Sequence, residues 1–270
     1  MTIKVGTSGF GIARSKYTGV FECVEVQHTF YQPPRISTLE RWREEAPPDF
    51  EFVIKAWQLI THDAKSPTYR RLKKELSEGE REEAGYFRAT PIVMEAWEVT
   101  LACALALRAR TILFQCPASF KQTKENISNL RKFFKTVARS SKRTADAHPL
   151  NFAWEPRGDW DSKVVKAICD ELGLWHAVDP FVAATVTPDK LYFRLHGRGG
   201  WRYEYDDEEM RELAAKIPAR KSDAPVLPES AEDQPSYVFF NNVRMTQDAL
   251  RFREILAEGH EVNTTTQQRG

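Results

Sequence analysis

The sequence predicts an α/β fold, a single TIM-type (β/α)8 barrel. Three observations favour this fold: eight short apolar segments, helical patterns between many of them, and one consistent polar face along the strands. Strands that alternate with helices form parallel sheets, and eight of them in about 250 residues fit a closed barrel. An open doubly wound sheet is the alternative, although the chain lacks the G-x-G-x-x-G turn of its dinucleotide-binding form.

Each predicted strand is a run rich in Val, Ile, Phe and Tyr with turn-forming residues at its ends. Gly, Pro, Asp and Asn stop such runs because they favour turns or cannot continue a strand ladder. The strands are predicted at residues 3–8, 23–28, 50–56, 111–116, 151–157, 174–179, 191–197 and 237–242.

Apolar residues spaced three and four apart predict helices between these strands. The helices are predicted at residues 94–107, 124–139, 161–172, 206–217 and 246–257. Asp161 and Asp206 precede two of them as N-cap residues. Gly173 and Gly259 follow two of them as C-terminal glycines.

The barrel is expected to occupy residues 1–259 as one domain. Two stretches interrupt the pattern: a charged insertion at 61–91, with one helix near 69–76, and a proline-rich connection at 218–235. Residues 260–270 are polar and are expected to form a flexible tail.

Composition is that expected of a cytoplasmic globular protein. Of the 270 residues, 41% are hydrophobic, enough for a sizeable core, and the net charge of +1 gives no general attraction for polyanions. The chain opens without a leader-like segment, and Glu95 and Glu98 interrupt its most apolar stretch, so no membrane association is expected. The four scattered cysteines favour free thiols in a reducing compartment. The oligomeric state stays open.

The strand period of two separates an apolar face from a polar face. Phe193 and Leu195 share one face of the seventh strand, while Tyr192, Arg194 and His196 share the other. Along the chain the polar face carries Ser8, Glu25, Gln27, Lys55, Gln115, Glu155, Arg157, Asp179, Arg194 and His196. Outward positions of a barrel pack under helices, so this face should point inward and gather at the carboxyl ends of the strands, where barrel enzymes have their active sites.

Three side chains on the polar face are candidate catalytic groups. Glu155 has Arg157 two residues away on the same face, which predicts an ionised, oriented general base, although a structural ion pair explains the same pattern. His196 titrates near neutral pH and can transfer protons. Asp179 can serve as a second acid or base, although Asp before Pro180 is also a common turn starter.

A second set of residues suits a small anionic or phosphorylated ligand. Arginine offers a fixed fork of donors to phosphate or carboxylate, and Gly199 and Gly200 let the backbone approach a ligand closely. The candidate substrate-binding residues are Arg194, Arg198, Lys55, Arg157, Glu25, Asn241, Asn242 and Trp201.

Several of these assignments have alternatives. Arg194 is also suited to a structural bridge with Glu155 or Asp179 across the barrel. Lys55 is suited to binding phosphate, to neutralising nearby carboxylates, or to Schiff-base chemistry. Three acidic residues and His196 on the polar face are of types that bind divalent metals, but three cationic side chains share the face and would repel a metal ion. No metal site and no cofactor are predicted.

Six short motifs in these strands carry a family resemblance. They are V-G-T-S-G-F (5–10), V-E-V-Q-H-T-F-Y (24–31), F-E-F-V-I-K-A followed by I-T-H (50–62), L-F-Q-C-P-A-S-F (113–120), Y-F-R-L-H-G-R (192–198) and V-F-F-N-N (238–242). Together they resemble the domain of unknown function 72 family, also called YecE-like, over residues 3–257. The resemblance implies a TIM-type barrel and no established reaction.

The candidate positions follow the family pattern unevenly. The matching positions are Glu25, Lys55, Glu155, Arg157, Arg194, His196, Asn241 and Asn242. Many members have Asn-Ser where this chain has Gln27-His28, and an E-F-R-H-like run where it has Pro156 between Glu155 and Arg157. The resemblance therefore implies no role for Gln27, His28 or Pro156.

The expected function is acid–base catalysis on a phosphorylated or otherwise anionic substrate, by a hydrolase or lyase acting at the C-terminal mouth of the barrel. One alternative is a metal-dependent phosphodiesterase of nucleic acid, by fold-level analogy with endonuclease IV barrels. Residues 121–143 carry eight basic residues and one acid, a candidate polyanion surface, although most such runs are solvated helix faces. The other is a non-catalytic module that binds a metabolite or, through the 61–91 insertion, a partner.

Overall fold

Eight parallel strands form a nearly closed barrel in the computed structural model, which describes residues 2–144, 149–218 and 235–267. The strands are β1 (Ile3–Thr7), β2 (Cys23–Val26), β3 (Glu51–Lys55), β4 (Thr111–Gln115), β5 (Asn151–Glu155), β6 (Trp175–Val178), β7 (Tyr192–Leu195) and β8 (Ser236–Phe240). Regular parallel pairing runs from β2 through β8 to β1. Between β1 and β2 it shrinks to one bridge, between Ser8 and Glu25. The predicted TIM-type barrel is confirmed.

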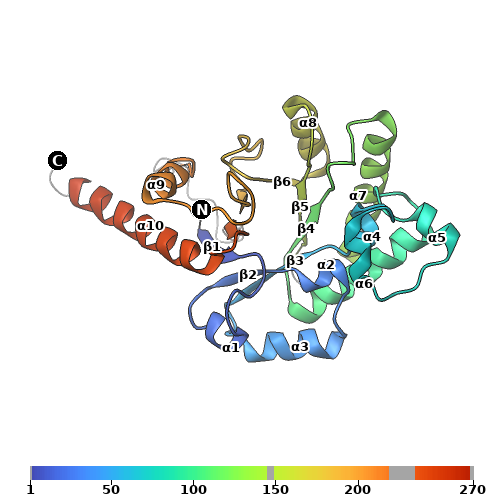
Figure 1. Cartoon of the computed structure of the whole chain (residues 1–270), viewed down its shortest axis with the longest axis horizontal. Helices are drawn as coiled ribbons and strands as arrows, with labels where there is room; N and C mark the ends of the chain where they lie inside the picture. The colour runs from blue at the N-terminus through green and yellow to red at the C-terminus, as the bar shows by residue number, and fades with distance from the viewer. Residues whose placement is uncertain (1, 145–148, 219–234, 268–270) are drawn as a thin grey trace.

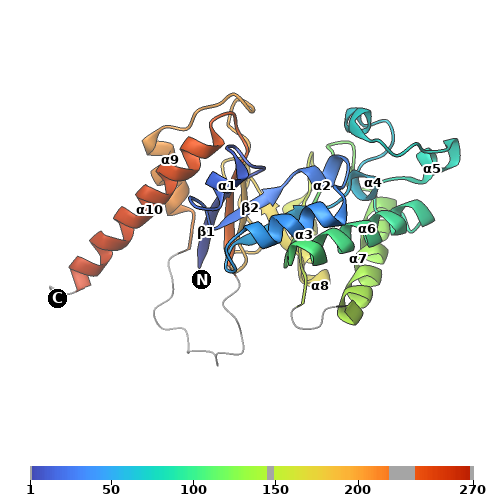
Figure 2. The same cartoon turned by 90° about the horizontal axis from the view of Figure 1, so that it is seen from below.

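Helices lie around the outside of the strands (Figure 1). They are α1 (Arg14–Tyr17), α2 (His28–Tyr31), α3 (Ile36–Glu45), α4 (Gln58–Thr61), η1 (Pro67–Arg71), α5 (Glu78–Glu83), α6 (Pro91–Leu107), α7 (Lys124–Thr144), α8 (Ser162–Leu172), α9 (Asp207–Ala215) and α10 (Met245–Gln267). In the view turned by 90°, α10 projects beyond α9 and β1 (Figure 2). The connection from β6 to β7, which the structure describes completely, contains turns and no helix.

Local capping chemistry fixes two of the helices where the sequence predicts it. Asp161 accepts a hydrogen bond from the Lys163 amide at 2.7 Å and begins α8, which ends at Gly173 in the left-handed region with φ of 67°. Asp206 and Glu209 form a reciprocal capping box at the start of α9. These contacts satisfy backbone groups that a helix end otherwise leaves unpaired.

Two predicted boundaries are wrong. In the insertion at 61–91, the helix expected near 69–76 is instead the short 3₁₀ helix η1, which Ser66 and Pro67 begin and which ends at Arg71. The next helix, α5, begins only after the capping box of Ser77 with Glu80. Gly259 does not end α10, whose backbone stays helical to Gln267, so most of the expected tail at 260–270 is helix. No proline follows Gly259, and an interior glycine costs a helix only about 1 kcal/mol. The connection at 218–235 lies outside the described residues except at its two ends.

Two apolar clusters separate the barrel interior from the layer between strands and helices. The interior cluster comprises Cys23, Val53, Leu113, Ala153, Trp175, Ala177, Tyr192, Tyr237 and Phe239. The larger outer cluster holds the alternate strand positions, such as Val24, Ile54 and Trp154, together with the helices. Because strand side chains alternate, residues two positions after the interior ones, such as Glu25, Lys55 and Glu155, share the inward face.

Two further expectations concern the cysteines and the membrane. The four cysteines are free and buried, as the sequence predicts. Within the described ranges, none of the helices combines the length and the apolarity that spanning a bilayer requires.

Candidate functional site

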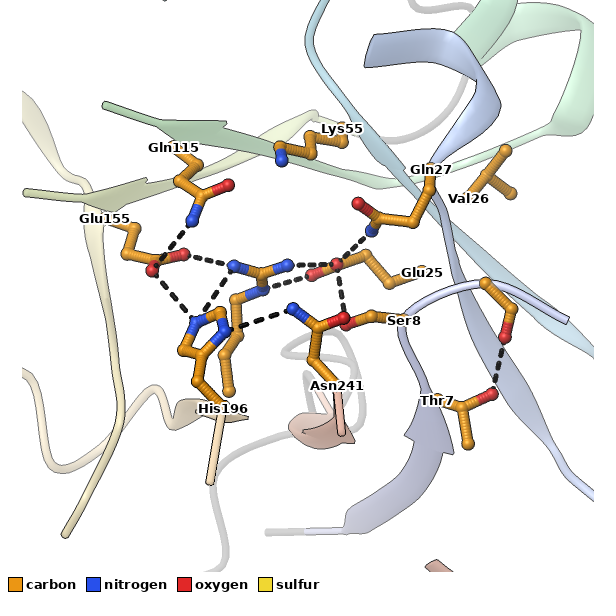
Figure 3. A network of polar contacts seen from close by, with 12 residues as sticks. Thr7, Ser8, Glu25, Val26, Gln27, Lys55, Gln115, Glu155, His196 and Asn241 are labelled. Carbon is orange, nitrogen blue, oxygen red and sulfur yellow. Dashed lines mark hydrogen bonds and ion pairs between the residues drawn. The ribbon is translucent and has the colours of Figure 1, made fainter. Parts of the chain in front are cut away.

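Arg194 lies at the centre of a polar cluster at the carboxyl ends of the strands. Its side chain is buried, and Nε and Nη2 donate to the two carboxylate oxygens of Glu25 at 2.9 and 2.8 Å. Nη1 donates to Glu155 Oε2 at 2.5 Å. One guanidinium thus joins carboxylates from β2 and β5, which lie on opposite sides of the cluster (Figure 3). The structural bridge to Glu155, one of the two alternatives for Arg194, is present in the structure.

Glu25 is fully buried, and its carboxylate accepts hydrogen bonds from four side chains. In addition to Arg194, Tyr192 donates its hydroxyl at 2.7 Å, Ser8 donates at 2.9 Å, and the Gln27 amide donates to Oε1. Burial alone would raise the pKa of Glu25, but the charge and hydrogen bonds of Arg194 and the Tyr192 hydroxyl hold it below its ordinary value. Glu25 is therefore an ionised anchor for Arg194.

Glu155 is similarly saturated. Its Oε1 atom accepts from Arg157 Nε at 2.9 Å and from the Gln115 amide at 3.2 Å, and it lies 3.2 Å from His196 Nε2. Burial opposes ionisation, but the charge of Arg194, the His196 hydrogen bond and the charge of Arg157 hold the pKa of Glu155 well below its ordinary value. The predicted pairing of Glu155 with Arg157 is present, and the carboxylate has few free lone pairs.

His196 has a partner for each of its protonation states. Nε2 lies 2.7 Å from Arg157 Nη2, from which a neutral imidazole accepts, and 3.2 Å from Glu155 Oε1, to which a protonated imidazole donates. Nδ1 lies 3.0 Å from the side-chain amide of Asn241. Burial lowers the pKa of His196 more than the Glu155 hydrogen bond raises it, so the neutral form dominates at pH 7. The side chain keeps 23% of its exposure, enough to meet a ligand.

Lys55 lies in the same cluster but takes no part in its hydrogen bonds. It is 5% exposed, and its amine lies 3.8 Å from the centroid of the Phe30 ring. Among the described residues, its Nζ atom has no hydrogen bond and no ion pair. Burial and the charge of Arg194 lower its pKa to about 7, against the opposite effects of Glu25 and Glu155. Figure 3 shows the side chain extending between Gln115 and Gln27 toward the centre of the cluster.

A cavity of about 330 Å³ opens beside this cluster, between the carboxyl ends of β5, β6 and β7. Ligand pockets span about 300–1,000 Å³, so this cavity suits a small molecule. Its polar lining includes Glu155, Arg157, Asp179 and His196, and its apolar lining includes Trp160 and Val182.

Asp179 lies on the cavity wall with its carboxylate engaged by backbone groups. Oδ1 accepts from the Phe181 amide and Oδ2 from the His196 amide, both at 3.0 Å. The first contact is the turn that an Asp before Pro180 favours. The second joins the loop after β6 to the end of β7, which fixes the backbone from which the His196 imidazole projects.

Arg198 lies apart from the Arg194 cluster. Its guanidinium contacts Glu209 at 3.2 Å and Glu212 at 2.6 Å, and it stacks over the Phe181 ring at 4.3 Å. These contacts join the loop after β7 to α9. The anion-binding role expected for Arg198 therefore has less geometric support than that of Arg157, which contacts Glu155 and His196.

Asn242 and Trp201 occupy the rim of the barrel mouth. The Asn242 amide donates to the Tyr203 carbonyl at 2.8 Å and to Asp248 at 2.6 Å, which ties the loop after β7 to α10. Trp201 is 58% exposed, with the Arg202 guanidinium 4.7 Å over its ring. Of the two asparagines expected to bind ligand, only Asn241 contacts the cluster, through His196.

The structure adds Tyr192 to the site residues. The strand period places Tyr192 on the inward face two positions before Arg194, so the signal was present in the sequence. Ser8, Gln27 and Gln115 also belong to the cluster, and the strand period predicts all three on the polar face. In the part of the chain that the structure describes, no group of three or more His, Cys, Asp or Glu side chains is arranged to hold a metal ion.

Comparison with known proteins places the chain in a family. The family described as "Protein of unknown function DUF72" matches residues 13–269. The chain belongs to the DUF72 family. This confirms the resemblance that the strand motifs indicate.

Three relatives of this family are similar to the chain over most of their own length. The UPF0759 protein YunF of Bacillus subtilis (strain 168) is 26% identical over 208 residues, covering 73% of this chain and 67% of YunF. A DUF72 family protein from Enterococcus faecalis V583 superposes with a TM-score of 0.66 at 21% identity, covering 95% of this chain and 96% of the other. One from Thermotoga maritima MSB8 superposes with a TM-score of 0.65 at 22% identity, covering 95% and 100%. Both structures support the barrel fold.

Proposed function

We propose that this DUF72 chain is an enzyme that performs acid–base chemistry on a small anionic substrate at the carboxyl end of its barrel. His196 transfers the proton, Glu155 stabilises the protonated imidazole, and Arg157 and Lys55 bind the anionic group. The observation that carries the proposal is the position of His196, which has a partner for each protonation state and lines the cavity. A proton-transfer group needs both states to be accessible near neutral pH.

The charge balance of the cluster favours an anionic ligand. Glu25 and Glu155 carry two negative charges, which Arg194 and Arg157 balance in the hydrogen-bonded network. Protonated Lys55 then adds a positive charge without a paired carboxylate. Arg157 keeps 39% of its side chain exposed, so it can reach a ligand while holding Glu155. Arginine and lysine are the usual partners of carboxylate and phosphate groups.

Glu155 is better placed to assist than to abstract a proton itself. It already accepts from Arg194, Arg157 and Gln115, so its basicity is low. An ionised carboxylate next to an imidazole stabilises the imidazolium that forms when the histidine takes a proton. The geometry therefore favours His196 as the base, with Glu155 as its electrostatic support.

The proposal is tested by a ligand screen followed by turnover. Phosphorylated and carboxylate metabolites are screened by thermal shift at pH 7.5, and each hit is followed by proton NMR in D2O for conversion or deuterium incorporation. Arg157→Gln should weaken binding of the hit at least about tenfold, the effect of losing one charged hydrogen bond. Arg244→Gln is the matched control, because Arg244 precedes α10 at the same end and pairs only with exposed Glu204 among its described contacts.

His196→Gln separates binding from chemistry. It should retain the hit and lower conversion about 10²–10⁴-fold, the usual contribution of a general base. Conversion at the wild-type rate by His196→Gln would overturn the role of His196. Binding of a hit with no conversion by wild-type protein would favour the non-catalytic metabolite-binding alternative.

A further inference from the structure

We propose that Lys55 is a nucleophile that condenses with a carbonyl group of the substrate to form an imine. The proposal rests on the function proposed above and narrows its substrate class to small anionic aldehydes or ketones. It assigns Lys55 to bond formation, where the charge argument alone assigns it to binding.

The first support is that Lys55 has no counter-ion although two carboxylates share its cluster. Glu25 and Glu155 are both occupied, chiefly by Arg194, which takes three of their four oxygens. A lysine buried for structural reasons needs a paired carboxylate to offset its desolvation. Lys55 has only the face of the Phe30 ring. The site thus holds an amine whose hydrogen-bonding capacity is unused.

The second support is that the surroundings favour the neutral amine, which is the nucleophilic form. Burial disfavours the ammonium, and the Arg194 charge adds to this effect, followed by a smaller one from Arg157. His62, whose ring centroid lies 5.0 Å from that of Phe30, has its pKa lowered to about 3 by burial and then by the charge of Lys55, so it is neutral and adds no charge of its own at pH 7. Desolvated lysines beside other cations are the kind that form Schiff bases.

The third support is access. Among the described residues, the polar side-chain atoms that lack both solvent contact and a hydrogen bond belong to Trp57, Gln58, Thr111, Asn242 and Arg251. Lys55 Nζ lacks a hydrogen bond but is not in this group, so it retains contact with solvent. Figure 3 shows the amine directed toward the cluster from β3. Lys55 is 5% exposed and does not line the 330 Å³ cavity, so the proposal requires a carbonyl compound small enough to reach past the cavity lining to the amine.

The reaction balances without a cofactor or an oxidant. The neutral amine of Lys55 attacks the carbonyl carbon, a C–N bond forms, and the carbonyl π electrons move to oxygen. One proton moves from nitrogen to that oxygen and gives a carbinolamine. His196 takes a proton from solvent and delivers it to the hydroxyl, which leaves as water; the C–O bond breaks, and the nitrogen lone pair forms the C=N bond of a protonated imine.

The first test measures the reactivity of the Lys55 amine, with formaldehyde as a probe small enough to enter the cluster. The full chain is treated with formaldehyde and cyanoborohydride between pH 6 and 9, and methylation is mapped by peptide mass spectrometry. Lys55 should be methylated with a midpoint near pH 7. Lys166, an exposed lysine on α8 paired with Asp170, is the reference lysine in the same sample. Lys55 left unmodified where Lys166 reacts, or titrating together with it, would overturn the proposal.

Substrate class is tested second, by comparing glyoxylate with acetaldehyde under cyanoborohydride. Yield at Lys55 is divided by yield at Lys166 in the same sample, which removes the intrinsic reactivity of each aldehyde. The ratio should favour glyoxylate at least about tenfold, and Arg157→Gln should abolish that preference. Lys55→Met, checked for folding by its melting curve, should lose this peptide's adduct and keep that of Lys166.

The two proposals fail in different ways. Equal ratios for the two aldehydes would overturn the anionic substrate class while leaving Lys55 as a nucleophile. No adduct at Lys55 with either aldehyde would overturn imine formation, and Arg157-dependent binding of a hit in the metabolite screen would still support acid–base chemistry on an anion.

Discussion

Arg194 and Glu25 form a bidentate ion pair that is sealed inside the barrel, with the two side chains 1% and 0% exposed. Its two parallel hydrogen bonds are 2.9 and 2.8 Å long. A buried pair of this kind adds little net stability, because both ions lose their hydration, but removing one partner leaves an uncompensated charge. The pair therefore fixes the geometry of the cluster more than it stabilises the fold.

Arg194→Met should lower the free energy of unfolding by about 3–5 kcal/mol, because Glu25 and Glu155 lose their shared cation. Urea unfolding at pH 7 measures the loss. Arg41→Met is the control, since Arg41 is 62% exposed and lies 3.9 Å from Glu45, and it should change stability by less than about 1 kcal/mol. The double variant Glu25→Gln/Arg194→Met should recover part of the loss. Wild-type stability of Arg194→Met combined with lost ligand binding would show that Arg194 acts on the ligand instead.

The strand faces were predictable from sequence, whereas two helix boundaries were not. Alternation decides the faces, because one side of every strand packs under helices and tolerates only apolar residues. In the insertion, the apolar spacing at 69–76 suggests a helix, but the stronger local signal is the capping box at Ser77 and Glu80. At Gly259, a weak breaker without a following proline leaves the helix to continue.

The candidate site was predictable as a set of residues and not as a set of contacts. Period two places Arg194, Glu25 and Glu155 on one inward face. Which carboxylate meets Arg194 depends on strand stagger and on pairs more than 30 residues apart, such as Glu25 with Arg194, and no local pattern encodes these. Arg198 lies just past the strand, where alternation ends, so its turn toward α9 has no sequence signal.

The free energy of unfolding should decrease at acidic pH because two histidines are buried in their neutral form. Burial lowers the pKa of His62 to about 3 and that of His176 to about 4, whereas each titrates near 6.5 when unfolded. As the pH drops below about 6.5, the two histidines bind protons in the unfolded chain but stay neutral in the folded chain. Stability is full above that pH and falls toward pH 4, by about 1.4 kcal/mol per pH unit for each histidine.

Denaturant unfolding at several pH values between 7.5 and 4.5 measures this slope. His62→Gln should reduce it by the share of one histidine, and His28→Gln, at an exposed histidine in α2, should leave it unchanged. The same slope in His62→Gln as in wild type would refute the assignment.

Gly6→Ala should destabilise the barrel at its weakest closure. A Cβ at Gly6 would lie 2.5 Å from the Cys23 carbonyl oxygen, so β1 and β2 would have to separate where they share a single bridge. Overpacking of this kind costs about 1–3 kcal/mol. Gly79→Ala is the control, because Gly79 lies in α5 with open space around it, and alanine there should stabilise by up to about 1 kcal/mol. Equal melting temperatures for the two variants would contradict the prediction.

Asp179→Asn distinguishes a backbone-fixing carboxylate from a proton-transfer group. An asparagine can accept from only one of the Phe181 and His196 amides, since its NH2 group faces the other donor. The expected loss is about 1–3 kcal/mol of unfolding free energy. Asp170→Asn, in an exposed pair with Lys166, should lose less than about 1 kcal/mol. If Asp179→Asn keeps wild-type stability but no longer converts a screened substrate, Asp179 instead takes part in the chemistry. Proton transfer would then require the carboxylate, whereas the fold would not.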